Sequence, residues 1–481
     1  MTLTDRTRWF ALYVLCLGSL MIVLDVTIVN VALPSIRESL GFSATSLAWV
    51  VNAYMLTFGG FLLLGGRLGD LFGHRRLFVG GIALFTVASL ACGVSTSQGL
   101  LIGARAVQGL GGAVASAVSL SLMMNLFTEP GDRAKAMGIF GFVASGGGSL
   151  GVLLGGILTD ALNWHWIFLV NVPIGALVVL LTLRLIPDGR GVAQEGRLDV
   201  AGALTVTGSL LLAVYAIVNG NQQGWTSART LGLLAVAAAL LALFVAIEAR
   251  VAAPLVPLRL LRKRNLAFSN VVGVLWAAAM FALFFLSALY LQLVLGYSPL
   301  QVGLAFLPAN LIMGAFSIGL SAKLVLRLGI RPPLTTGLLI AAVALALFAR
   351  VPVHGSFALD VLPSMILLGI GAGMAFNPVL LAAMSDVEPQ ESGLASGVVN
   401  TAFMMGGALG LAVLASVAAA RTKALGGAGD PAALVGGYHL AFVVGAVFAL
   451  AAATIGGLFL RASVAGQHVH GASTEPAQAT T

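Results

Sequence analysis

The chain has 481 residues, of which 59% are hydrophobic and only 9% are charged, and its formal net charge is +8. A soluble protein carries roughly 25% charged residues, because much of its surface must face water, so this composition excludes a water-soluble globular protein. The apolar runs are continuous and about 20 residues long, which is typical of membrane-spanning helices and not of barrel strands, whose side chains alternate.

Fourteen apolar runs are long enough to cross a bilayer, so we expect an all-α membrane protein with 14 transmembrane helices. In chain order they are 10–33, 46–65, 77–96, 100–126, 136–160, 166–186, 199–219, 229–249, 267–295, 301–325, 333–350, 357–384, 393–419 and 437–461. The first run is too long for the apolar part of a signal peptide and has no small-residue cleavage site, so we expect no cleavable leader.

The charges cluster in the short segments between these runs. If the N-terminus is inside, the inside segments hold 19 of the 25 Lys and Arg residues, the outside segments hold five, and Arg105 lies within a span. Inside loops are enriched in Lys and Arg, so both termini are expected to be cytoplasmic. The basic charge then sets topology, and we expect no nucleic-acid partner.

Cys16 and Cys92 lie in apolar runs and are expected to pack as small hydrophobes, with no metal or other cofactor.

The chain also repeats itself with a shift of 259 positions, which places residues 129–151 on 388–410. Glu-Pro pairs coincide at 129–130 and 388–389, and Gly-Gly pairs coincide at 147–148 and 406–407. A parallel repeat of this kind predicts two six-helix bundles related by a pseudo-twofold axis, with two central inserted helices left over. The expected division is 1–190 for the N-terminal bundle, 191–262 for the linker with the inserted helices, 263–462 for the C-terminal bundle, and 463–481 for a disordered cytoplasmic tail.

The loop after the second span carries a charge cluster punctuated by glycines. Asp70 sits at a helix end with arginines on both sides, so it can pair with them or with a neighbouring helix in one conformation only, while the glycines let spans 2 and 11 approach closely. Anchoring of topology alone is the plainer interpretation. The segment, with a degenerate echo at 319–331, is a candidate conformational latch that comprises Gly66, Arg67, Gly69, Asp70, Gly73, Arg75 and Arg76.

This segment resembles the cytoplasmic signature of the major facilitator superfamily. Residues 24–34 (LDVTIVNVALP) resemble the first-helix signature of its fourteen-span drug:proton antiporter family, and residues 105–112 (RAVQGLGG) resemble its proton-coupling motif. Residues 164–173 and 392–401 fit the same family. The resemblance covers nearly the whole chain and implies export of a drug, antibiotic or secondary metabolite in exchange for protons.

One position departs from that family. Its antiporters carry a Gly-Pro pair in the fifth span, whereas Val152 follows Gly151 here, which leaves open symport or uniport. The glycines that permit close helix packing remain. This expected packing motif comprises Gly147, Gly148, Gly151, Gly155 and Gly156.

Two charges lie deep within spans of the N-terminal half. Asp25 is about 15 residues from the inner end of its span, and Arg105 is about five residues from the outer end of its own, so at 1.5 Å per residue both lie roughly 22 Å from the inside. Burial favours the protonated acid and Arg105 favours the carboxylate, so a conformational change can load and release a proton. The alternative is a static ion pair that joins the two helices.

Other polar, aromatic and Met residues in the spans are candidates for a greasy, adaptable substrate cavity. They are Asn30, Trp49, Asn52, Tyr54, Gln108, Phe281, Gln292, Asn310, Asn377, Asn400 and Met404. With Asp25 the one obvious acid, a lipophilic monovalent cation or a neutral amphiphile is the expected substrate.

The sequence therefore predicts a multi-pass secondary transporter of the bacterial plasma membrane. It is not expected to be an enzyme, and its expected partners are a lipophilic small molecule, protons and membrane lipids, with the chain acting as a monomer. Three alternatives remain: a dedicated exporter of one metabolite or lipid, a symporter or uniporter, and a membrane receptor without transport.

Overall fold

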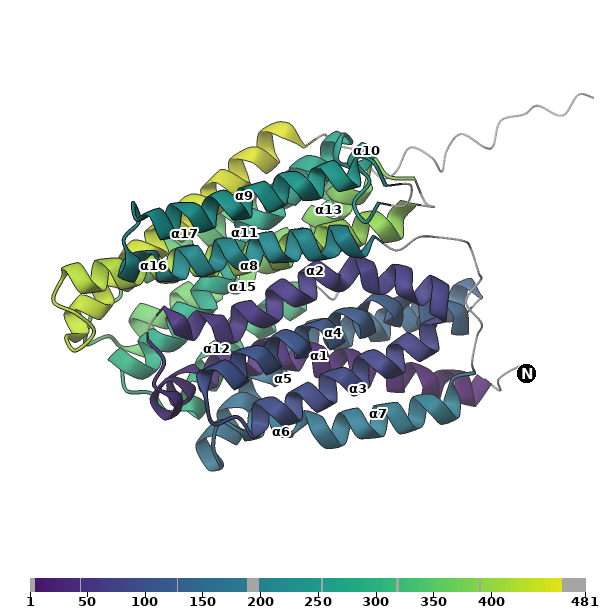
Figure 1. Cartoon of the computed structure of the whole chain (residues 1–481), viewed down its shortest axis with the longest axis horizontal. Coiled ribbons are helices and arrows are strands. Elements are labelled where there is room, and N and C mark those ends of the chain that lie inside the picture. Colours follow the sequence, from purple (N-terminus) through teal and green to yellow (C-terminus); the bar gives the residue numbers. More distant parts are fainter. Residues whose placement is uncertain are drawn as a thin grey trace, which may run out of the picture.

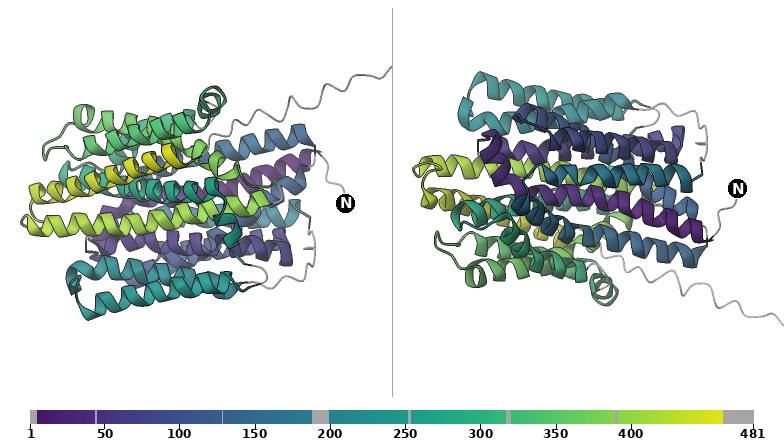
Figure 2. Two further views of the ribbon diagram at one scale, coloured as in Figure 1. Left: turned by 90° about the horizontal axis from the view of Figure 1, so that it is seen from above. Right: turned by 90° about the horizontal axis from the view of Figure 1, so that it is seen from below.

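The chain folds into long helices that run side by side along one axis (Figures 1 and 2). The structure, a computed structural model, describes residues 5–43, 45–127, 129–187, 199–251, 254–316, 320–388 and 391–460. We call the end of the array where the first helix begins the N-terminal end, and the opposite end the far end. The tail from 463 onward, expected to be disordered, lies outside the described residues.

The described residues form nine α-helices in the first part of the chain and eight in the second. The first nine are α1 (Asp5–Leu40), α2 (Trp49–Phe72), α3 (His74–Gly93), α4 (Gln98–Leu126), α5 (Pro130–Ala161), α6 (Trp166–Leu169), α7 (Asn171–Leu185), α8 (Val200–Gln223) and α9 (Ala228–Glu248). The others are α10 (Leu258–Leu261), α11 (Arg264–Leu289), α12 (Pro299–Ala315), α13 (Ser321–Leu328), α14 (Arg331–Phe348), α15 (Leu362–Met384), α16 (Ser392–Ala424) and α17 (Pro431–Phe459). A short 3-10 turn, Ser46–Ala48, precedes α2, and π-helical turns lie at Tyr290–Val294 and Phe357–Val361.

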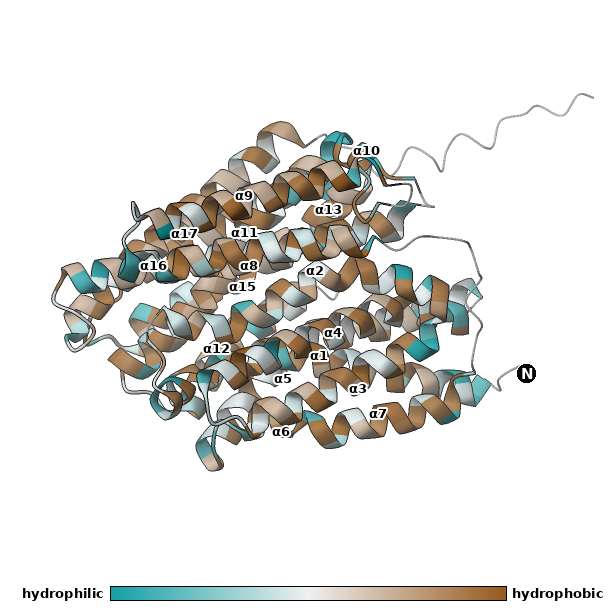
Figure 3. Ribbon diagram, in the orientation of Figure 1, coloured by the Kyte–Doolittle hydropathy of each residue, from teal (hydrophilic) through white to brown (hydrophobic). Residues whose placement is uncertain are grey.

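Twelve helices among the described residues are long and apolar enough to cross a membrane. Two shorter apolar helices, Gly147–Ala161 and Pro299–Ala315, correspond to the predicted spans 136–160 and 301–325. Most residues along the helices are hydrophobic (Figure 3), and many large apolar side chains are exposed on the outer surface. A surface of this kind is stable against lipid and not against water, so the predicted membrane class is right, while the count of fourteen stays a prediction.

The same helix pairings occur in the two parts of the chain. α5 packs on α1 and α16 packs on α11; likewise α4 packs on α2 and α3, as α15 packs on α12 and α14. The sharp turns between α2 and α3 and between α13 and α14 each use a glycine with positive φ, Gly73 at 94° and Gly329 at 81°. These matches follow the repeat seen in the sequence.

The α11–α16 pair shows why the repeated glycines are needed. A Cβ on Gly406 would lie 2.6 Å from the Cα of Val274, and one on Gly410 would collide with Ala278. In the other pair, Gly151 lies against Thr27 and the backbone of Leu24. Without a hydrophobic driving force between helices in lipid, close backbone packing is a main source of their association.

The two parts of the chain meet along two seams. α5 lies against α12, and α2 lies against α16. α8 packs on both α2 and α16, whereas α9 makes its main contacts with α8. α8 therefore covers the seam between α2 and α16.

Replacing Gly410 by Ala is expected to destabilise the protein by about 1–3 kcal/mol, because the added methyl group overpacks the α11–α16 contact. The measurement is the free energy of unfolding in detergent micelles. Gly273→Ala in α11 is the control, since a Cβ there meets nothing within 4 Å. Equal stability of the two variants would contradict the packing described.

Candidate functional site

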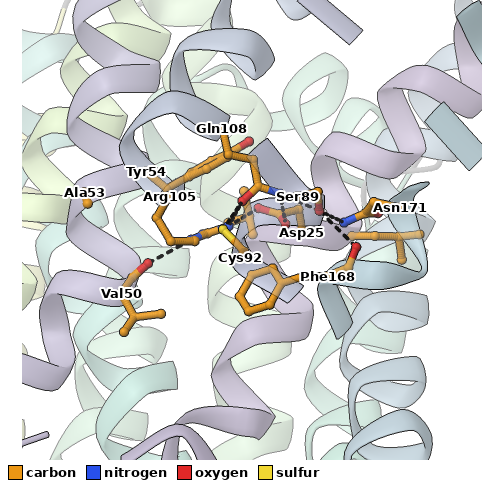
Figure 4. Close-up of polar contacts among 12 residues, drawn as sticks. Asp25, Val50, Ala53, Tyr54, Ser89, Cys92, Arg105, Gln108, Phe168 and Asn171 are labelled. Atoms are coloured by element: carbon orange, nitrogen blue, oxygen red, sulfur yellow. Dashed lines mark hydrogen bonds and ion pairs between the residues drawn. The ribbon is translucent and has the colours of Figure 1, made fainter. Parts of the chain in front are cut away.

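A buried polar network lies inside the first part of the chain, and its centre is the carboxylate of Asp25 in α1 (Figure 4). Arg105 in α4 donates from Nη1 to Oδ2 of Asp25, with which it forms an ion pair. Gln108, one turn further along α4, donates from Nε2 to Oδ1 of Asp25 over 2.7 Å and accepts from Nη1 of Arg105 over 2.8 Å. Each of the three side chains is at most 1% exposed, so the pair is withdrawn from water and lipid.

A second layer of hydrogen bonds holds Gln108 in place. Its Nε2 also donates to Ser89 in α3 over 3.0 Å, and Asn171 in α7 donates to the same hydroxyl over 3.1 Å. The Ser89 hydroxyl donates to the backbone carbonyl of Phe168 over 2.9 Å. These partners fix the orientation of the Gln108 amide, so that it donates to the carboxylate of Asp25 and accepts from the guanidinium of Arg105 at the same time.

The guanidinium of Arg105 is held on its other sides by α2. Its Nε donates to the carbonyl of Val50 over 2.9 Å, and its Cζ lies 4.4 Å from the ring centroid of Tyr54. The ring of Phe168 lies 5.6 Å away. A buried arginine surrounded by a carboxylate, carbonyls and aromatic faces is well compensated, so the network can hold two charges at a depth where unpaired charges are costly.

This arrangement can respond to a proton. Protonation of Asp25 would remove the negative charge that compensates Arg105, and only neutral partners would remain around a buried cation. A shift of α4 relative to α1, or entry of water, would relieve that imbalance. Proton binding at Asp25 would therefore be linked through this one contact to a movement of α4 relative to α1.

The structure brings Asp25 and Arg105 into contact, so the two side chains lie at one level along their helices. Gln108 and Tyr54, expected to line a substrate cavity, instead form part of the buried network. Sequence reasoning missed Ser89 and Asn171, although an Asn near the start of an apolar span was a visible signal.

The other amide candidates lie in different surroundings. Asn30 and Asn400 donate to carbonyls of their own helices, and Gln292 donates to the carbonyl of Val31 in α1 over 2.8 Å. Asn52 is fully buried with neither amide atom bonded, and Nδ2 of Asn310 is also buried without a partner. Trp49 and Asn377 are half-buried. The structure thus gathers the network but does not gather these amides into one site.

An aromatic cluster lies on three helices of the second part of the chain. The ring of Phe403 in α16 packs edge-on against Phe281 in α11 at 5.9 Å and against Phe376 in α15 at 6.0 Å. Phe376 is 44% exposed. Met404 follows Phe403 and contacts the α2 seam at Gly59. These apolar side chains lie next to the α2–α16 seam, and a substrate cavity there stays a prediction.

The candidate latch segment lies at the N-terminal end. The Asp70 side chain is 65% exposed and lies 3.3 Å from His74, and Arg67 and Arg76 are also exposed. Arg75 donates to the carbonyl of Leu183 near the end of α7 over 2.6 Å.

The expected close approach of spans 2 and 11 is not seen at these glycines. A Cβ on Gly69 would fall near Val118 in α4 and one on Gly66 would meet nothing within 4 Å, while Gly73 forms the turn after α2. In this conformation the segment therefore packs within its own half.

The glycines of α5 serve two neighbours. Gly147, Gly151 and Gly155 lie against α1, with only a loose contact for Gly148, while a Cβ on Gly156 would lie 2.8 Å from the backbone of Leu300 at the start of α12. The carbonyl of Val152 lies against Gly303, 2.9 Å from the position of a Cβ there. α5 runs without interruption from Pro130 to Ala161, as expected for a span with Val152 in place of proline.

A second buried acid pair was not predicted from the sequence. It lies at the N-terminal end of the helix array, where α8 begins and α9 ends. Asp199 caps α8 by accepting from the amide of Gly202 over 2.6 Å, and Glu248 accepts from the amide of Val256 over 3.0 Å. Both side chains are at most 4% exposed. The pair anchors the segment after α9, whose Leu255 packs with Leu64 in α2.

The ion pair itself can be tested by a double-mutant cycle. Asp25→Leu or Arg105→Met alone is expected to destabilise the protein by about 3–5 kcal/mol, because each leaves a buried charge unpaired, whereas the double variant should lose much less than the sum. The free energy of unfolding in micelles is measured. Asp5→Asn with Arg8→Met, an exposed pair on the same helix, is the control and should change stability little. Additive losses at Asp25 and Arg105 would contradict the geometry.

Comparisons with known proteins agree with this fold. The sequence profile of the Major Facilitator Superfamily matches residues 15–411. The chain is 41% identical to a puromycin resistance protein of Streptomyces alboniger, over 93% of this chain and 89% of that one. It is 38% identical to a cephamycin export protein of Amycolatopsis lactamdurans (94% and 93%) and to a lincomycin resistance protein of Streptomyces lincolnensis (89% and 87%).

Among solved structures, a POT family transporter aligns with a TM-score of 0.69 at 15% identity, over 95% of this chain and 98% of that one. That likeness concerns the fold alone. The profile match covers most of the chain, and the relatives align over nearly their full lengths. This protein is a membrane transporter that belongs to the major facilitator superfamily.

Proposed function

We propose that the protein exports a lipophilic small molecule from the bacterial cell in exchange for protons, by alternating access between two helix bundles. The observation that carries the proposal is the buried Asp25–Arg105–Gln108 network, which joins the one acid deep in the spans to a helix that can move with it. Ionisable residues in a bilayer are costly and usually functional.

The proposed architecture has fourteen spans. α5 is a continuous helix of 32 residues, about 48 Å long at 1.5 Å per residue, which is more than a bilayer core requires. α12 with α13 would supply the remaining span. The bundles are then α1–α7 and α11–α17, and α8–α9 is the inserted pair between them, in line with the repeated helix pairings.

The proposed orientation puts the N-terminal end in the cytoplasm. The distribution of Lys and Arg favours it. Contacts between the halves at the far end include Gln292 with Val31, and Gly156 with Leu300, whereas Asp70 at the N-terminal end is exposed. We therefore interpret this conformation as closed toward the outside, with the latch segment on the inside packed within its own half and not against the other half.

The coupling step is an exchange at Asp25. In the proposed cycle, Asp25 is ionised while it is buried and paired with Arg105, the arrangement of the conformation described. Opening toward the outside would hydrate the network and allow a proton to bind, and return to the inside would restore the ion pair and expel the proton. The same movement would determine when a substrate can bind to the aromatic surface beside the seam.

The substrate class follows from the relatives and from the second half of the chain. The relatives' names refer to puromycin, cephamycin and lincomycin. The C-terminal half has carboxylates only in loops and at helix ends, so its middle is apolar and suits amphiphiles that bind by aromatic and Met contacts. We infer an antibiotic-like substrate, neutral or with a single positive charge.

The test is proton-driven transport in inside-out vesicles with an imposed pH gradient. Addition of puromycin, lincomycin or a lipophilic cation should dissipate the gradient with the wild type and not with Asp25→Asn, because the amide keeps its hydrogen bonds but does not titrate. Asp160→Asn at the far end of α5 is the control and should transport like the wild type.

Two outcomes would contradict the proposal. If Asp25→Asn moves substrate with unchanged proton coupling, the proton site lies elsewhere and the ion pair is structural. If substrate gradients form in the direction of proton flow, the protein is a symporter, the possibility raised by Val152.

A further inference from the structure

A cavity of about 190 Å³ opens at the far end, where α1 and the turn before α2 meet the second part of the chain. Arg37 and Leu47 come from the first part, and the remaining lining residues come from α11, α16, α17 and the α16–α17 turn. Most of these are apolar: the walls include Phe285, Leu289, Ala415, Ala419 and Leu434.

The polar residues that line the cavity are basic or neutral, and none is acidic. Arg37 and Lys423 carry positive charge, Tyr438 and Thr422 are neutral, and no carboxylate lines the cavity. Arg37 is half-buried and Lys423 is exposed, and neither forms an ion pair with a described carboxylate. The cavity is thus apolar, with unneutralised positive charge and a tyrosine ring beside it.

Along the helices, the basic and apolar lining residues follow one another in the same order as the headgroup and the acyl chains of a lipid in a leaflet. Arg37 lies in the last turn of α1 and Lys423 in the last turn of α16. Ala415 is eight residues back along α16, which is about 12 Å deeper at 1.5 Å per residue. Cationic groups at helix ends lie at headgroup depth, and the apolar walls then extend toward acyl-chain depth.

We propose that this cavity binds an anionic phospholipid of the far-end leaflet. The phosphate lies between Arg37 and Lys423, where two cations offer charge-assisted hydrogen bonds, and one acyl chain enters the apolar cavity. An apolar cavity of roughly 150 Å³ takes up a benzene-sized ligand, so about 190 Å³ holds the first part of a chain, and the remainder lies along the helices.

The site joins the two halves of the protein. Because Arg37 and Leu47 belong to one half and Lys423 to the other, separation of the halves at this end would break the site. The bound lipid therefore stabilises the conformation described here, and an anionic leaflet would favour closure of this end.

The test measures lipid binding by native mass spectrometry of the purified full-length protein in a neutral detergent. Dioleoyl phosphatidylglycerol and dioleoyl phosphatidylcholine are compared for the wild type, for Arg37→Gln with Lys423→Gln, and for Ala419→Phe, which fills the cavity without changing charge. The matched control is Arg229→Gln with Arg350→Gln, which removes two cations at the same end that do not line the cavity. Thermal unfolding of each variant verifies that it is folded.

We expect the wild type and the control pair to retain one tightly bound phosphatidylglycerol, with at least tenfold weaker binding of phosphatidylcholine. Both cavity variants should weaken phosphatidylglycerol binding at least tenfold. Equal retention by the wild type and both cavity variants would overturn the site. Octanoate is tested in the same way as a soluble anionic amphiphile. If the wild type retains octanoate and does not retain phosphatidylglycerol, a lipid is not the occupant and the site serves a soluble anionic amphiphile.

Discussion

The contact between Asp25 and Arg105 is the constraint on which the first half of the structure depends. Lipid offers no hydrogen bonds, so two charges placed in the middle of the bundle must be satisfied by protein alone. That requirement draws α1, α2, α3, α4, α6 and α7 around one network through Gln108, Ser89 and Asn171. The second half has no comparable network among the described residues; glycine contacts and aromatic packing hold it together.

This difference between the halves suits a transporter that moves one bundle against the other. The buried ion pair lies within the first half, and Glu391 pairs with Arg259 and Lys263 within the second. Across the seams the described contacts are mostly close backbone approaches at Gly156, Gly303 and Gly59. Such contacts are specific in shape but carry no charge to neutralise when they separate, which makes them suited to reversible closure.

α8 contacts the helices on both sides of the α2–α16 seam. A Cβ on Gly60 in α2 would collide with Thr207 in α8, while Asn221 in α8 donates to the carbonyl of Ser416 in α16 over 2.7 Å. One helix thus contacts both sides of the α2–α16 seam. α9 is largely exposed, as expected of a helix that faces lipid on most sides. α8 is therefore placed to restrict how far that seam would open in the proposed cycle.

The sequence by itself determined the membrane class, the helical fold and the internal repeat, and it predicted a common depth for Asp25 and Arg105, because length, hydropathy and the 1.5 Å rise per residue are local properties. The tertiary structure alone decided which helices meet. It placed Gln108 and Tyr54 in the charge network and not on a cavity wall, because the direction of a side chain on an apolar helix depends on which neighbours surround it. For the same reason Arg37 and Lys423, 386 positions apart in the sequence, line one cavity only after the two halves of the chain have packed together.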